Sequence, residues 1–126
     1  MRIAISVATF LFIAFVSAGP ALAVDPVFNT GGKAIRGYDP VAYFTEEKAV
    51  KGKSEHSFTF QGAIWQFSSA ANQELFAANP EKYAPQYGGY CAWAVVNNYT
   101  ASIDPDAWSI CDGKLYLNYS KLVRAR

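Results

Sequence analysis

Residues 1–23 form an apolar leader, and this segment limits how much of the chain is left to fold. Arg2 is its only charged residue, Ile3 to Val16 is almost wholly apolar, and Ala21 to Ala23 provides the small residues that a signal peptidase accepts. The apolar stretch is too short for a membrane span of about 20 residues. We therefore predict a signal peptide over residues 1–23, cleavage after Ala23, and a periplasmic or secreted protein with no stable membrane span.

Without the leader, about 103 of the 126 residues remain, which is enough for one domain. We expect an N-terminal arm over residues 24–36 and a single domain over residues 37–126. Once Arg2 is removed, the ten remaining basic residues balance ten acidic ones, so the net charge is about zero. Because nucleic acids and anionic membranes are bound by a clustered surplus of Lys and Arg, neither is an expected partner.

Aromatic residues supply much of the apolar material after the leader. All eight Tyr, all three Trp and six of the nine Phe follow Ala23. Each ring buries about 150–250 Å² when packed, which helps a small domain to build a sufficient core. We therefore expect most of the rings to serve packing.

The middle of the chain predicts a β-hairpin followed by helices. Phe58–Phe60 and Ala63–Phe67 flank the turn pair Gln61–Gly62. Ser68 and Ser69 offer hydroxyl caps for a helix that runs to about Ala78. A second short helix, residues 80–83, follows because Pro80 is favoured in the first turn of a helix.

Two further apolar segments and a second hairpin complete the pattern. Val41–Phe44 is predicted as a short strand or an aromatic-rich turn, and Gly88–Val96 as a buried strand or a tight turn leading into one. Residues 107–111 and 115–119 flank Asp112–Gly113, a favoured hairpin turn, and Ser120 can cap a terminal helix. The fold class expected is α+β, with a small antiparallel sheet built from two β-hairpins and short helices packed on it.

The order of residues through the first hairpin and its helix resembles the YHS domain family. Phe60–Phe76 follows the family spacing Tyr-x-Gly-x-x-Tyr-x-Phe-Cys-Ser-x-x-Cys-x-x-x-Phe, Asn79–Tyr83 follows Asp/Asn-Pro-x-x-Tyr, and Asp39–Ala42 is similar to the opening Asp-Pro-Val-Cys. Gly88–Trp93 and Asp112–Ser120 resemble the exported bacterial branch of the family. The resemblance implies a YHS-like fold over most of the chain that follows the leader.

This chain departs from the resembled family at the thiols. Family members that handle copper and other heavy metals carry cysteines where this sequence has Ala42, Ser68 and Asn72. Hydroxyl and amide groups are hard, weak ligands, whereas Cu(I) prefers sulfur and Zn(II) prefers thiolate, imidazole or carboxylate. The resemblance therefore supports the fold without transferring the family's metal site.

Cys91 is the strongest candidate for metal chemistry, because it follows two glycines and has aromatic residues on both sides. Three interpretations remain open: a buried small hydrophobe, a disulfide to Cys111 in an oxidising compartment, or a functional thiol. His56 is the only histidine, and with Cys91 and Cys111 it could make a low-coordinate Cu(I) site. The candidate metal ligands are thus Cys91, Cys111 and His56, for copper or another soft metal ion.

A small-ligand pocket is the alternative kind of site. Apolar pockets with a few convergent hydroxyl groups are typical of small-ligand binding, and the candidates to line one here are Tyr43, Tyr87, Tyr90 and Trp93.

No catalytic set of residues is recognisable, so the chain is not expected to be an enzyme. No histidine follows Cys91 to act as its base. Asp104, Asp106 and Asp112 lie in ordinary turn sequences. We therefore expect an exported binding module of YHS type that binds a soft metal, such as copper, through Cys91. The alternative is a module for a non-metal small ligand or a protein partner that keeps the scaffold without a metal site.

Overall fold

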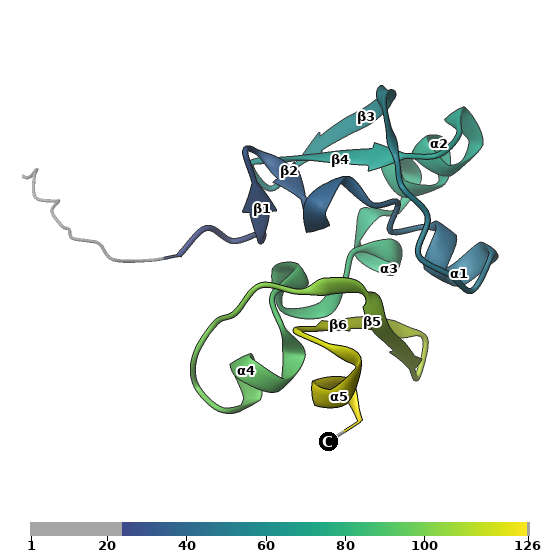
Figure 1. The fold of residues 1–126 in the computed structure, drawn as a ribbon. Helices are drawn as coiled ribbons and strands as arrows, with labels where there is room; N and C mark the ends of the chain where they lie inside the picture. Colours follow the sequence, from purple (N-terminus) through teal and green to yellow (C-terminus); the bar gives the residue numbers. More distant parts are fainter. Residues whose placement is uncertain (1–23, 126) are drawn as a thin grey trace, which may run out of the picture.

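The computed structural model describes residues 24–125. The predicted signal peptide, residues 1–23, lies outside the described residues. Two small β-sheets with short helices around them confirm the α+β class (Figure 1). No helix within residues 24–125 has the length and apolar character needed to cross a membrane.

Figure 1 labels the strands β1–β6 and the helices α1–α5, and two 3-10 helices lie between them. In chain order, the elements are β1 (Asn29–Thr30), β2 (Lys33–Ala34), the 3-10 helix η1 (Ile35–Gly37), α1 (Ala42–Thr45), β3 (Lys53–Phe60), β4 (Ala63–Phe67), α2 (Ala70–Ala78), α3 (Pro80–Tyr83), the 3-10 helix η2 (Gln86–Gly89), α4 (Ala92–Val96), β5 (Asp104–Cys111), β6 (Lys114–Asn118) and α5 (Lys121–Arg124).

The first hairpin, β3–β4, has the predicted turn. Gln61 and Gly62 both adopt positive φ, 52° and 79°, as a tight two-residue hairpin turn of type I′ requires. The register then pairs Phe58 with Trp65 and Phe60 with Ala63. The predicted helix after β4 is present as α2, and the Ser69 hydroxyl accepts the N–H of Asn72 as its N-cap.

The two predicted hairpins lie in separate sheets rather than in one. Beside β4, the edge opposite β3 is taken by β2, which pairs in parallel through Lys33 and Ile64. Since that edge is occupied, β5 and β6 form a two-stranded sheet of their own. The segment predicted as an N-terminal arm therefore supplies two strands, and its residues Val27, Ala34 and Ile35 are buried in the core.

Two segments predicted as strands or turns are helical instead. Residues 42–45 form α1, because the buried carboxylate of Asp39 accepts the N–H groups of Val41 and Ala42 and turns the chain there. Residues 92–96 form α4, because the side chain of Asn118 accepts the N–H of Trp93 in the first turn of the helix. Side-chain acceptors thus decide both segments: Asp39 lies just before α1, and Asn118 lies 25 positions from Trp93.

An aromatic cluster fills the core beneath the first sheet. Phe76 of α2 lies with ring centroids 5.2 Å from Trp65 and 5.1 Å from Phe67, and both strand residues are fully buried. Tyr43 of α1 connects this part of the protein to the second hairpin, since its ring lies 5.3 Å from Trp108 and its hydroxyl donates to the Pro105 carbonyl at 2.7 Å.

Candidate functional site

Asp39 is a fully buried carboxylate at the junction of α1, β4 and α2. Its Oδ1 accepts the N–H groups of Val41 at 2.8 Å and Ala42 at 3.3 Å. Its Oδ2 accepts the Ser68 N–H at 2.8 Å, the Ser68 hydroxyl at 2.9 Å and the Asn72 amide at 2.8 Å. A buried charge is tolerated only when it is paired or hydrogen-bonded, and here five donors meet that need.

The three positions where the resembled family carries thiols all contact this carboxylate. Ala42 contributes its backbone N–H, Ser68 its hydroxyl and N–H, and Asn72 its amide, whose nitrogen also lies 3.4 Å from the Ser68 Oγ. The positions therefore converge in space, but hydrogen-bond donors occupy them. Across residues 24–125, no group of three or more His, Cys, Asp or Glu side chains is placed to hold a metal ion.

Cys91 lies just before α4, with only 1% of its surface exposed. Its sulfur accepts the N–H of Tyr119 at 3.2 Å, and its thiol points to the Asn118 Oδ1 at 3.9 Å. The same oxygen accepts the Trp93 N–H at 3.1 Å. Cys91 and Asn118 therefore join the start of α4 to the end of β6, and this node positions Trp93.

Cys91, Cys111 and His56, the three candidate metal ligands, make no contact with one another. Cys111 is exposed beside the hairpin turn and pairs with Lys114 at the start of β6, whereas Cys91 contacts the other end of that strand. The strand rises about 3.3 Å per residue, so roughly 13 Å separates its two ends. Both cysteines are free, and this separation is too large for a disulfide.

His56 lies in β3, in the other sheet. Its Nε2 is 3.8 Å from the exposed carboxylate of Glu55, and about a quarter of its side chain is exposed. Cys91 lies before α4 and Cys111 lies in β5, so neither cysteine shares an element with His56.

Two of the four residues predicted to line a pocket serve other roles. Tyr43 is buried, and that burial, followed by the charge of Asp106, raises the pKa of its hydroxyl well above the usual range. Tyr90 packs its ring on Phe28 and donates to the Asp25 carbonyl at 2.9 Å; partial burial and the charge of Asp25 raise its pKa too. The Tyr43 and Tyr90 hydroxyls therefore do not point into one shared cavity.

Tyr87 and Trp93 do line one cavity together. This cavity, of about 270 Å³, lies between α4, α5 and the second hairpin, and a neighbouring cavity of about 230 Å³ holds Cys91, Tyr99 and Tyr119. Trp93 and Val123 line both, so the cavities adjoin. We call the pair the Trp93 cleft; its lining residues are Tyr87, Cys91, Ala92, Trp93, Val96, Tyr99, Ala101, Ser109, Tyr116, Asn118, Tyr119, Val123 and Arg124.

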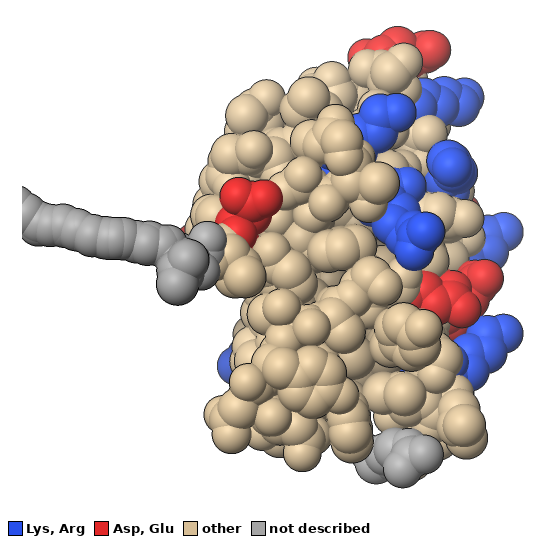
Figure 2. All heavy atoms as spheres, turned by 60° about the vertical axis from the view of Figure 1, so that its left-hand side comes forward, with Lys and Arg blue, Asp and Glu red and all other residues tan. Residues whose placement is uncertain are grey.

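The surroundings of the Trp93 cleft are exposed and apolar. Val96 is 69% exposed, Tyr119 59% and Leu122 71%. Arg124 is the only lining side chain with a full charge, and it donates to the Trp108 carbonyl at 3.2 Å. Figure 2 shows a broad, nearly uncharged surface on the lower part of the molecule, with Lys and Arg gathered along one edge. A ligand here would meet mainly rings and hydrocarbon.

Sequence reasoning missed the residues that organise both places. The sequence shows Asp39 only as part of an opening similar to that of the family. It does not predict that Asp39 is the common hydrogen-bond acceptor for Ala42, Ser68 and Asn72, the positions where the family carries thiols. A signal for it did exist, because a serine and an asparagine replaced cysteines in the same chain. Asn118 and Val123 gave no signal, because their roles depend on contacts between distant elements.

Comparison with known proteins identifies one family. The model of the YHS domain matches residues 41–87, which include Ala42, Ser68 and Asn72 and end at Tyr87. Cys91 and most of the Trp93 cleft follow the matched segment. Neither the curated proteins nor the solved structures gave a match.

Proposed function

We propose that this chain, which belongs to the YHS domain family through residues 41–87, is an exported module that binds a small, largely apolar organic ligand in the Trp93 cleft. The observation that carries the proposal is the pair of adjoining cavities that share Trp93 and Val123. Their combined size and aromatic lining are those of small-molecule sites, which are mostly apolar with a few polar groups. We assign the module no catalytic activity.

Three polar groups give the cleft its orienting contacts. Ser109, Tyr116 and Arg124 are among the polar residues that line the cavity of about 270 Å³. The neighbouring cavity is almost wholly apolar in its lining. We therefore expect the ligand's polar end to lie near Arg124 and its apolar body to lie near Tyr99 and Val123.

Soft-metal binding through Cys91 is the rival function. The family's link with metals supports it, and so does the position of Cys91 on the wall of the smaller cavity. Against it stand the burial of the sulfur, its hydrogen bonds to Asn118 and Tyr119, and the distance of Cys111. Cu(I) binds tightly where two or more soft donors converge. Cys91 is a single buried thiol, so we favour an organic ligand over copper as the occupant of the cleft.

Export is part of the proposal and rests on the apolar leader. Fractionation of the native host, with N-terminal sequencing of the accumulated protein, tests it. We expect the protein outside the cytoplasm, with Val24 as its first residue. An intact leader on the accumulated protein would contradict this part of the proposal.

A neutral fluorescent probe, N-phenyl-1-naphthylamine, tests the cleft directly. We expect saturable binding, weakened at least tenfold by Val96→Asp, which places a charge at the rim of an apolar cavity. Leu75→Asp is the matched control, because Leu75 is an exposed apolar residue of α2 away from the cleft. Equal binding by both variants would overturn the proposed site.

Titration with Cu(I) against a competing chelator distinguishes soft-metal binding through Cys91 from binding of an organic ligand. We expect equally weak binding by the wild type and Cys91→Ser. Stoichiometric binding that Cys91→Ser abolishes would favour the metal function instead.

A further inference from the structure

The orientation of the Asn118 amide limits what the Trp93 cleft can hold. Asn118 is only 6% exposed and lines the cavity of about 270 Å³. Its Oδ1 accepts the Trp93 N–H at 3.1 Å, and the Cys91 thiol points to the same oxygen at 3.9 Å. Because a backbone N–H can only donate, the amide oxygen must face α4, and the NH₂ group is the part of the side chain left to face the cavity.

The Asn118 NH₂ group has no protein partner. It donates to no acceptor within residues 24–125, although the side chain is more than nine-tenths buried. A buried donor without an acceptor is rare in folded proteins and costs free energy. A ligand that brings an acceptor oxygen into the cavity would satisfy it.

Two further polar residues share a face of the second hairpin with Asn118. Ser109 pairs with Tyr116 across the two strands, and Asn118 follows Tyr116 by two positions in β6. Paired residues, and residues two apart in one strand, point to the same face of a sheet. All three line the larger cavity, so its hairpin wall carries a row of groups that can donate hydrogen bonds.

Arg124 gives the cleft its only full charge. No Asp or Glu lines either cavity, and no carboxylate within residues 24–125 lies at salt-bridge distance from Arg124. One N–H of the guanidinium donates to the Trp108 carbonyl at 3.2 Å, and Trp108 pairs with Leu117, the residue before Asn118. The positive charge is therefore held at the same part of the hairpin as the Asn118 amide, with further N–H groups to offer.

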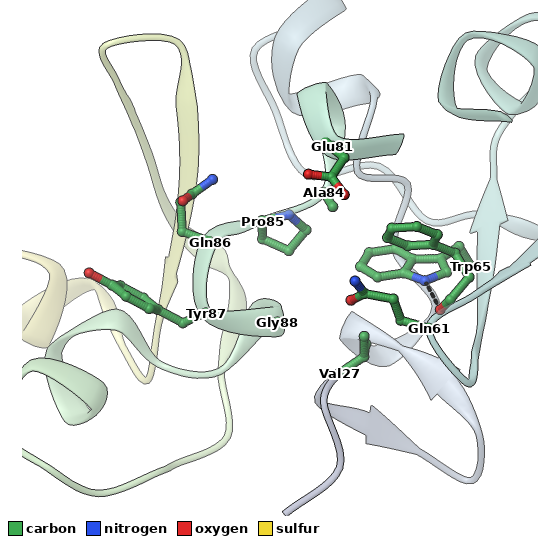
Figure 3. A pocket seen from close by; sticks show the side chains of 10 residues that line it. Val27, Gln61, Trp65, Glu81, Ala84, Pro85, Gln86, Tyr87 and Gly88 are labelled. Atoms are coloured by element: carbon green, nitrogen blue, oxygen red, sulfur yellow. Dashed lines mark hydrogen bonds between the residues drawn. The ribbon is translucent and has the colours of Figure 1, made fainter. Parts of the chain in front are cut away.

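A neighbouring cavity, of about 160 Å³, has a lining of opposite charge. Figure 3 shows Glu81 at its top, and Tyr87 with its ring pointing away from the other lining residues. That ring lies near Tyr116 of the Trp93 cleft instead, with 6.1 Å between the ring centroids. A carboxylate thus lines one cavity and a guanidinium the other, so an anion is favoured in the Trp93 cleft alone.

The smaller cavity of the cleft, of about 230 Å³, suits an uncharged group. Trp93 and Tyr99 line it with rings packed edge to face, 6.1 Å between centroids, and Val123 adds hydrocarbon. The Cys91 thiol also lines it, but this group already points to Asn118. Because no charged side chain lines this cavity, a charged ligand group belongs in the larger one.

Resting on the proposed function, we infer that the Trp93 cleft binds an organic acid that carries one carboxylate on an aromatic or alkyl body. A carboxylate oxygen accepts from the Asn118 NH₂ group, and the Arg124 guanidinium compensates its charge. The body of the acid lies against Trp93 and Val123, which line both cavities. Since charge-assisted hydrogen bonds are stronger than neutral ones, the acid should bind more tightly than a neutral compound of the same shape.

Calorimetric titration of the purified protein with 1-naphthylacetate and with 2-(1-naphthyl)ethanol tests the inference. The two compounds share the naphthyl ring and differ in the carboxylate that replaces the hydroxymethyl group. We expect the acid to bind at least tenfold more tightly than the alcohol. Higher salt should narrow this difference, because it screens the Arg124 charge.

Two variants assign the difference to the named groups. Asn118→Asp keeps an acceptor for the Trp93 N–H but replaces the NH₂ group with a carboxylate oxygen, so the acid should bind at least tenfold more weakly. Arg124→Gln should lower the affinity for the acid about tenfold and bring the ratio of acid to alcohol affinity toward one. Lys121→Gln is the matched control, because Lys121 is an exposed cation of α5 that lines neither cavity, and it should have no effect.

Circular dichroism checks that each variant is folded, and Arg124→Gln decides the test if Asn118→Asp is not. Three results would overturn the inference and leave the cleft as a site for neutral ligands: equal affinities for acid and alcohol, an acid affinity that Lys121→Gln lowers as much as Arg124→Gln, and an acid affinity that both cleft variants leave unchanged. If the acid, the alcohol and the naphthylamine probe all fail to bind, the proposed function falls together with the inference.

Discussion

The molecule has two polar nodes, one in each sheet region, and they differ in kind. In the region of β1–β4 with α1–α3, a buried carboxylate, Asp39, collects five donors. In the region of β5–β6 with α4 and α5, a neutral thiol and amide, Cys91 and Asn118, hold the start of a helix. The difference teaches that the first region is organised around a buried, fully satisfied charge, whereas the second region is organised around neutral groups.

The exposed apolar side chains divide in the same way. Ile64 and Leu75 are the large exposed hydrophobic residues of the first region's strands and helices. The second region exposes a larger set: Val96, Tyr99, Ile110, Tyr119 and Leu122. An exposed apolar surface beside cavities is suited to ligand binding, and a tight aromatic core is suited to stability.

The largest effect is expected from Asp39→Asn. In the variant, an amide NH₂ group faces the Ser68 and Asn72 donors that the carboxylate accepts in the wild type. We expect a loss of about 3 kcal/mol in the free energy of unfolding. Urea denaturation followed by circular dichroism measures it. Asp112→Asn, at an exposed turn residue with positive φ that Asn tolerates, is the control and should change stability by less than about 0.5 kcal/mol.

A smaller loss is expected from Asn118→Ala in the second node. It removes the acceptor for the Trp93 N–H and the Cys91 thiol, which should cost about 1–2 kcal/mol. The same variant should weaken the naphthylamine probe, because Trp93 is no longer positioned. A loss as large as that of Asp39→Asn would remove the contrast between the two nodes.

Tyr43→Phe probes the connection between the regions. Loss of the hydroxyl that donates to Pro105 should cost about 1 kcal/mol near pH 7. Burial raises the pKa of Tyr43, so the folded chain holds this proton more tightly than the unfolded one. Its stabilising contribution is thus complete below the unfolded value of about 10 and is lost as the pH rises above it. Denaturation at several alkaline pH values should show a steeper fall in stability for the wild type than for Tyr43→Phe; parallel curves would contradict the assignment.

The smallest effect on stability is expected from Cys111→Ser, since this thiol is exposed. The substitution should nevertheless abolish fast alkylation of the native protein. Alkylation of the native wild type should label one thiol quickly, and unfolding should release the second, Cys91. Native Cys111→Ser should then label slowly or not at all. Rapid labelling of both thiols in the native wild type would show that the second region opens more readily than its node implies.

Local sequence signals were sufficient for the hairpins and for the capped helices. Asp112–Gly113 and Gln61–Gly62 specify tight turns, and the Ser69 and Ser120 hydroxyls cap the helices that follow them. Residues 92–96 were not predictable in this way, whereas residues 42–45 had a local signal in Asp39, two and three positions before the N–H groups that it accepts. Their first-turn N–H groups are satisfied by Asp39 and Asn118, and the Asn118 contact joins residues 25 positions apart.

The candidate site was predictable only in part. Tyr87 and Trp93, two of the four residues predicted to line a pocket, line one cavity in the structure, whereas Tyr43 and Tyr90 make other contacts. The candidate copper ligands, Cys91, Cys111 and His56, were predicted from residue type alone. Residue type does not tell whether side chains lie close together in the folded protein. Trp93 and Val123 of the Trp93 cleft come from α4 and α5, which are separated in the sequence by the second hairpin, so no local pattern could have joined them.

The contact between the first described residues and η2 has a consequence for biogenesis. Gly88 accepts the Phe28 N–H at 2.9 Å, and its backbone lies so close to Pro26 that any larger residue would collide there. The segment around Phe28 therefore cannot dock until residues near 88 have been synthesised. Contacts between residues so far apart in the sequence slow folding, and slow folding would keep the nascent chain threadable for the export that we propose.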